Sequence, residues 1–237
     1  MARQSHNIVS GQIGPVVFYV VNGVGYARSA AQKVKQTKAT KESAKLFGKA
    51  VTIAGFLRRE ITGGLPDLRK NEAQYRFDNA MAQWLRLGNM NGKQEKLQDI
   101  NGFEFNEKSP LHSRFKQPFD VDFSDKGRIH FTVPEFNIPS DVNAPAHSHE
   151  LPWHVLVTSC DIRNKQGYGH AYDHVEMSFA HGNVAAQRIS LDCEIYKGTL
   201  TVVAVALRYA ATRKGKVVLV KEPAWLPTAI VGSYYLP

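Results

Sequence analysis

The sequence predicts an α+β protein in which an N-terminal β-hairpin and two helices precede a mainly antiparallel β-sandwich. Three observations support this prediction. A short apolar run ends at Asn22-Gly23, two later segments repeat apolar residues at helical spacing, and from Phe103 onward the spacing changes to every second residue. Of the 237 residues, 43% are hydrophobic, which is enough for a large core. The patterns divide the chain into a hairpin and basic arm at 1–36, a helical region at 37–100 and a β-sandwich at 101–237.

The first predicted element is a hairpin within residues 16–29. Its first strand is the apolar run Val16–Val21, and its turn is Asn22-Gly23, a dipeptide that tolerates the positive φ angles of tight turns. The return strand is predicted at 25–29. A two-stranded unit alone is barely stable in water, so its apolar side chains need a sheet or a partner to cover them. We therefore predict contact with another subunit through four residues: Val16, Phe18, Val20 and Tyr26.

Two helices are predicted after the hairpin. The first begins near Thr37 or Thr40, either of which can cap free N–H groups, and ends at Gly63-Gly64 before Pro66. Its predicted apolar face comprises Ala44, Phe47, Val51, Ala54, Leu57 and Ile61. The second covers about residues 70–87 and ends before Gly88, which suits a helix C-terminus. Its predicted apolar face comprises Ala73, Phe77, Ala80, Met81, Trp84 and Leu85.

The remaining chain reads as strands. Segments such as "FDVDFSDKGRIHFTVPEF", "WHVLVTSCDI" and "TLTVVAVALRYAA" follow one another with turn signals between them and no helical period. Such spacing predicts an antiparallel sandwich of roughly seven or more strands rather than βαβ units. The two cysteines, Cys160 and Cys193, lie in strand-like runs and exclude a disulfide scaffold. One cross-sheet bridge and two free buried thiols are both compatible with this placement, and the free thiols are preferred.

Charge is concentrated near the N-terminus. The formal net charge of +9 favours contact with polyanions such as nucleic acid or an acidic protein face. Residues 27–49 contain one acid, Glu42, and seven basic residues: Arg28, Lys33, Lys35, Lys38, Lys41, Lys45 and Lys49. An arm with these cations can neutralise several phosphates, and Tyr19 and Tyr26 can stack on bases. The competing interpretation is a helix face whose lysines are simply solvated.

Histidines are concentrated in the sandwich, where six of the nine fall between His147 and His181. No metal site is favoured, but the best candidate ligands are His147, His149 and His174. No paired-cysteine, HExxH or EF-hand pattern supports that set, and solvent-facing polar residues of sheet and loop are the preferred explanation. A G-x-S-x-G nucleophile motif is also missing from the sequence. We therefore predict that the protein is not an enzyme and has no cofactor, and the sequence identifies no small-molecule substrate.

The sequence shows no recognisable targeting signal. The apolar run at Val16–Val21 is too short for a signal-peptide core, and no stretch approaches the roughly 18 apolar residues that span a bilayer. We expect no membrane span, and cytoplasmic synthesis without a cleavable signal peptide.

The motif order "GQIGPVVFYVVNGVGYARS" followed by "TKATKESAKLFGKA" resembles an uncharacterised family of small bacterial and phage-encoded proteins. Its members open with a Gly-x-x-Gly hairpin, an Arg-Ser pair and a threonine-capped helix, and continue into a β-sandwich. The resemblance covers about residues 10–60 and, more loosely, the last strands. The matching positions are Gly11, Gly14, Gly23, Arg28, Ser29, Thr37 and Phe47. The resemblance implies a structural or assembly protein and supplies no catalytic residues.

These observations predict a self-associating structural protein, a homo-oligomer that forms part of a phage-like particle, tube or filament. Its basic arm would contact a polyanion or an acidic neighbour. The alternative is a nucleic-acid-binding protein that uses the basic arm as its site. A weaker alternative is a metal-dependent enzyme on the histidine-rich strands.

Overall fold

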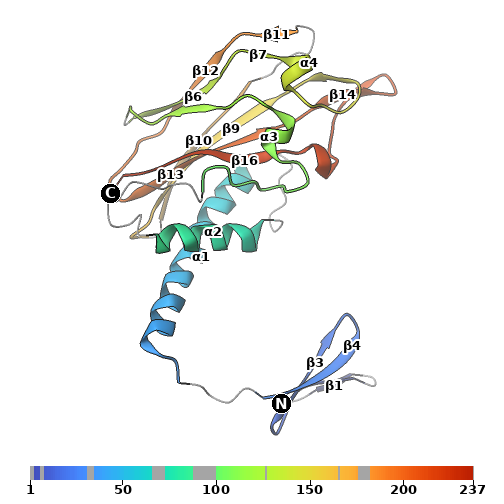
Figure 1. Cartoon of the computed structure of the whole chain (residues 1–237), viewed down its shortest axis with the longest axis vertical. Helices are drawn as coiled ribbons and strands as arrows, with labels where there is room; N and C mark the ends of the chain where they lie inside the picture. Colours follow the sequence, from blue (N-terminus) through green and yellow to red (C-terminus); the bar gives the residue numbers. More distant parts are fainter. Residues whose placement is uncertain are drawn as a thin grey trace. The chain divides into compact units, whose positions relative to one another are not determined.

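The computed structural model describes residues 3–5, 8–30, 35–65, 73–87, 100–125, 127–164, 166–175 and 182–236. The chain forms two compact units, Met1–Glu42 and Ser43–Pro237. Figure 1 shows a small sheet in the first unit, and helices packed on antiparallel sheets in the second. The predicted α+β class, with a hairpin and two helices before a β-sandwich, is confirmed.

The first unit contains an antiparallel sheet of four strands in the order β1-β2-β3-β4. These strands are β1 (Arg3–Ser5), β2 (Ile8–Ile13), β3 (Val16–Val21) and β4 (Val24–Ser29). The predicted hairpin is β3–β4, and its turn has φ of 50° at Asn22 and 81° at Gly23, as a type I′ turn requires. Strands β1 and β2 extend this hairpin beyond what the sequence predicts. Gly14, at φ 56°, allows the tight turn that joins β2 to β3.

The two predicted helices are α1 (Lys38–Gly64) and α2 (Gln74–Arg86). Thr37 caps α1, because its Oγ1 accepts the N–H of Thr40 at 3.2 Å. The predicted start of α2 near Lys70, and the cap at Gly88, lie outside the described residues. A salt bridge of 3.1 Å between Arg58 and Asp78 joins the two helices.

The predicted apolar face of α1 is only partly buried. Ala54, Leu57 and Ile61 are buried as predicted, whereas Ala44 and Phe47 are exposed. Burial along the helix begins at Ala50, where its side chains join the core formed with the sheet. Helical spacing identifies a stripe of apolar residues on α1. The length of the stripe does not show how much of it the sheet covers.

Two sheets form the sandwich of the second unit. The four-stranded sheet has the order β10-β9-β13-β16, and the three-stranded sheet has the order β12-β6-β5. Their strands are β10 (Gln166–Val175), β9 (Trp153–Asp161), β13 (Thr199–Leu207), β16 (Thr228–Tyr235), β12 (Gln187–Asp192), β6 (Arg128–Val133) and β5 (Asp120–Asp122). The smaller elements are β7 (Phe136–Asn137), β8 (Ser148–Glu150), β11 (Asn183–Val184), β14 (Ala210–Arg213), β15 (Lys216–Leu219), α3 (Leu111–Arg114), α4 (Ile138–Asp141) and the 3₁₀ helix η2 (Pro223–Trp225).

The four-stranded sheet is covered on both faces. Leu200, Val202 and Ala204 of β13 join α1 and α2 in one apolar core. Val203 and Val205 of the same strand face the three-stranded sheet in a second core. All nine residues of β13 are consequently buried, which explains its continuous apolar sequence. The helical region therefore shares a core with the sandwich, and the boundary between the compact units falls inside α1, after Glu42.

Helix α1 approaches the sheet closely at two glycines. A Cβ at Gly167 of β10 would lie 1.4 Å from the ring of Phe56, and one at Gly64 would lie 2.7 Å from Leu156. Both contacts are possible because glycine has no Cβ, since real Cβ atoms do not approach other atoms so closely.

The two cysteines are free thiols on opposite faces of the four-stranded sheet. Cys160 belongs to the core shared with the helices. Cys193 instead packs on the sandwich side, with its Sγ 3.6 Å from the Oγ of Ser159. Burial raises the pKa of Cys160 to about 12, and the nearby Asp161 contributes to the rise. A buried thiol of this kind is unreactive at neutral pH.

Candidate assembly and polyanion-binding surfaces

The N-terminal sheet has an aliphatic face. Opposite residues in an antiparallel pair point to the same side, so Val16, Phe18 and Val20 share a face with Ala27 of β4 and Ile13 of β2. Ile13 is 54% exposed and Val20 is 43% exposed, while Val16 and Phe18 are half-buried. Three of the four residues predicted to contact another subunit are therefore neighbours on one surface.

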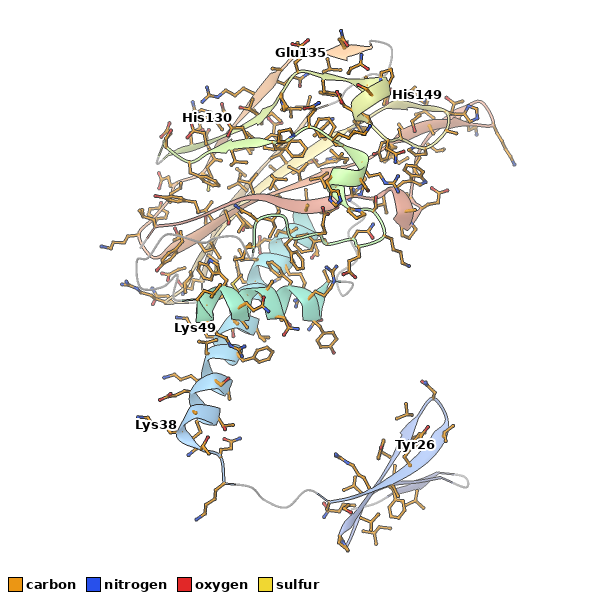
Figure 2. The ribbon with its side chains drawn as sticks, in the orientation of Figure 1. Tyr26, Lys38, Lys49, His130, Glu135 and His149 are labelled. Carbon is orange, nitrogen blue, oxygen red and sulfur yellow. The ribbon has the colours of Figure 1, made fainter. Side chains whose placement is uncertain are left out.

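The opposite face of the same sheet, called the aromatic face below, carries Tyr19, Tyr26 and Arg28 together with three valines: Val17, Val21 and Val24. Tyr26, the fourth predicted contact residue, pairs across the strands with Tyr19 rather than with the aliphatic set. The two rings are stacked, with centroids 5.6 Å apart and planes 22° apart. The guanidinium of Arg28 lies 5.9 Å from the centre of the Tyr19 ring. Figure 2 shows Tyr26 on this small sheet. The four predicted contact residues thus belong to two different surfaces.

The edges of this sheet add backbone hydrogen-bonding groups. Strands β1 and β4 are the outer strands, and all six residues of β4 are exposed. Within the described part of the chain, β4 pairs only with β3. An exposed edge strand of this kind is a template for pairing with another chain.

The predicted basic arm lies partly on β4, partly before α1 and partly on its first turns. Lys35, Lys38, Lys41 and Lys45 are exposed, Lys49 is half-buried, and Lys33 falls outside the described residues. Figure 2 shows Lys38 and Lys49 on the same helix. The first turn of α1 has no acidic residue. Because a helix N-terminus is itself positive, lysines there are unfavourable and an external anion would relieve the repulsion.

The structure describes the side chains of two of the three histidines considered as metal ligands. His147 lies in the turn before β8 with φ 63°, and His149 lies on β8 with Nδ1 3.4 Å from the hydroxyl of Thr212. The side chain of His174 is outside the described residues. Figure 2 shows His130 of β6 far from His149. In the described ranges, no group of three His, Cys, Asp or Glu residues is arranged to hold a metal ion.

Glu104 is a partly buried titratable residue that the sequence analysis did not identify as a candidate site residue. Its Oε1 accepts the N–H of Leu111 at 2.8 Å, whereas its Oε2 is buried with no hydrogen-bond partner among the described residues. Burial raises the pKa of Glu104 to about 7. The carboxyl borders a pocket of about 350 Å³ whose lining includes Phe115 and Phe119. No motif marks this residue, because the burial depends on a short bridge between Glu104 and Ala229 of β16.

Two basic side chains lie near Glu104, but they do not cancel the effect of its burial. Nδ1 of the exposed His112 lies 3.8 Å from its Oε1. The positive charge of Arg76 lowers the pKa of Glu104, but less than burial raises it. Arg76 is itself paired with Glu107 at 3.4 Å. Because burial raises the pKa of Glu104 to about 7, its carboxyl gains and loses its proton near neutral pH.

Comparisons of the chain with protein-family models, with curated proteins and with solved structures found no match. Within the described residues, no helix is long and apolar enough to cross a bilayer. What the fold defines is a β-rich α+β protein with a separate N-terminal sheet.

Proposed function

We propose that this protein is a self-associating structural protein that assembles through its N-terminal sheet. The observation that supports the proposal is the exposure of apolar side chains on a sheet that forms its own compact unit. Large apolar side chains gain roughly 1.5–3 kcal/mol each when they are fully buried. Ile13, Phe18 and Val20 on one face therefore provide a substantial driving force for covering that face.

The proposed occupant of the aliphatic face is the same face of a second copy. Two sheets packed face to face would form a small sandwich, and a two-fold axis allows the same patch to serve on both chains. The described side chains on this face, among them Ile13, Val16, Phe18 and Val20, are uncharged, so they do not repel their counterparts on a second copy. Further copies would add through the exposed edge of β4. Such growth suits a component of a phage-like particle, tube or filament.

Light scattering after size-exclusion chromatography tests this proposal. The full chain should show a mass that rises with concentration, and both deletion of residues 1–30 and Val20→Asp should yield monomers. Val217→Asp is the matched control, because Val217 is also an exposed strand valine but lies on β15 of the other unit. A full chain that stays monomeric at every concentration would refute self-association.

Binding of a polyanion through the basic arm is a second candidate function. The observation that favours it is the exposure of Lys38, Lys41 and Lys45 on a helix start without acids. If phosphates are neutralised, the logarithm of affinity falls linearly with the logarithm of salt concentration. Replacing these three lysines by glutamine should flatten that slope by about 2–3, measured with a labelled oligonucleotide.

A further inference from the structure

The aromatic face of the N-terminal sheet combines stacked rings and a guanidinium with the exposed Val21 and Val24. The register places Arg28, Tyr19 and Tyr26 on one side of β3 and β4, and their flat groups follow one another across the strands. Tyr19 is 40% exposed and Tyr26 is 47% exposed. A stacked pair of rings, with a guanidinium beside it, therefore lies on a surface open to solvent.

Nucleic-acid bases match this surface chemically. Every base offers a flat π-face that can stack on a tyrosine, and arginine adds a cation that interacts with rings and phosphates. Exposed lysines follow in the same compact unit: Lys35, Lys38 and Lys41. A surface that combines aromatic platforms with cations is complementary to a chain of bases joined by phosphates.

Single strands fit better than duplexes. In a duplex the base faces are already stacked on one another and are not accessible to tyrosine. The described residues of this face include two stacked rings that are open to solvent on a small sheet. A second copy of the chain is a less suitable occupant, because Arg28 of each copy would then approach the same basic surface of the other.

We propose that the aromatic face binds single-stranded nucleic acid, with Tyr19 and Tyr26 stacking on bases and Arg28 contacting phosphate. The inference rests on the second candidate function and names its ligand class and its residues. It leaves the aliphatic face of the sheet for self-association. The two faces of one sheet would thus serve two partners.

Fluorescence anisotropy with a labelled oligothymidine, and with a duplex of equal length, tests the proposal on the full chain. The single strand should bind more tightly than the duplex at the same salt concentration. Tyr26→Leu, which keeps an apolar side chain but removes the ring, should weaken single-strand binding about tenfold. Tyr26→Phe, which keeps the ring, should retain the affinity. Tyr75→Leu, at a tyrosine of α2 that is 82% exposed, should change nothing.

Light scattering on the same samples separates this inference from self-association. If Tyr26→Leu abolishes the concentration-dependent mass and leaves oligothymidine binding intact, the aromatic face is an assembly surface and the inference is wrong. Equal affinities of Tyr26→Leu and Tyr26→Phe would also overturn it, because phosphates alone would then explain the binding. If no strand of any kind binds, both this inference and the polyanion-binding function fail, while self-association is unaffected.

Discussion

Strands β4 and β13 illustrate how differently the two units use apolar sequence. All six residues of β4 are exposed, whereas all nine residues of β13 are buried. Both segments contain β-branched and small residues that favour strands. The difference lies in what covers them, since helices and a second sheet enclose β13, whereas β4 pairs only with β3 in the described part of the chain. Strand propensity therefore indicates that a segment forms a strand. Its exposure depends on how many layers of structure pack against that strand.

The largest expected effect comes from placing a carboxylate in each unit, which should destabilise the protein only where the strand is buried. Val205→Asp in β13 would bury an unpaired charge between two sheets and should lower the free energy of unfolding by more than about 4 kcal/mol. Val20→Asp on the exposed face of the N-terminal sheet should leave the main unfolding transition unchanged. Thermal unfolding followed by circular dichroism measures both. A Val205→Asp protein that unfolds at the wild-type temperature would contradict the burial of Val205 between the two sheets.

The second expected effect is a dependence of stability on pH that comes from the buried Glu104 and not from exposed carboxyls. Its folded pKa of about 7 exceeds the reference of 4.5, so the folded state binds the proton more tightly. The stabilisation is complete below about pH 4.5 and is lost as pH rises to about 7, with a total change of at most about 3 kcal/mol.

Urea unfolding at pH 5 and pH 8 measures this change, and Glu104→Gln should reduce the pH dependence by the same amount. The glutamine variant should also exceed the wild type in stability at pH 8, because it removes the buried charge. Glu135→Gln is the control at an exposed carboxyl, which Figure 2 places away from Glu104's strand partner β16. Identical pH profiles for the wild type and Glu104→Gln would show that Glu104 titrates normally.

The smallest expected effect concerns helix–sheet packing, which the N-terminal unit lacks in the described residues. Gly167→Ala should cost about 1–3 kcal/mol, because the new methyl group overlaps the ring of Phe56. Gly63→Ala is the matched control, since a Cβ there meets no atom within 4 Å. Combining Gly167→Ala with Phe56→Leu should recover part of the loss in the free energy of unfolding. Equal stabilities of the two alanine variants would contradict the close contact.

Local signals predicted local structure well. The turn at Asn22-Gly23 and the cap at Thr37 are confirmed because each depends on residues within a few positions of one another. The extent of burial on α1 was predicted less well, since Phe47 is exposed although it continues the apolar stripe. The candidate surfaces divide in the same way. Residue types indicated an apolar and basic N-terminus, but only the register separated Tyr26 from Val20.

The sequence by itself determined the order of elements, the hairpin turn, the helix cap and the basic character of the arm, because these depend on neighbouring residues and composition. Only the tertiary structure decided that α1 and α2 cover the four-stranded sheet, that Tyr19 and Tyr26 stack, and that Glu104 is buried. The cover on the sheet and the burial of Glu104 depend on contacts between segments distant along the chain, whereas the stacking depends on the register of the β3–β4 hairpin. Burial and pairing are properties of the surroundings of a residue, and a linear pattern does not contain those surroundings.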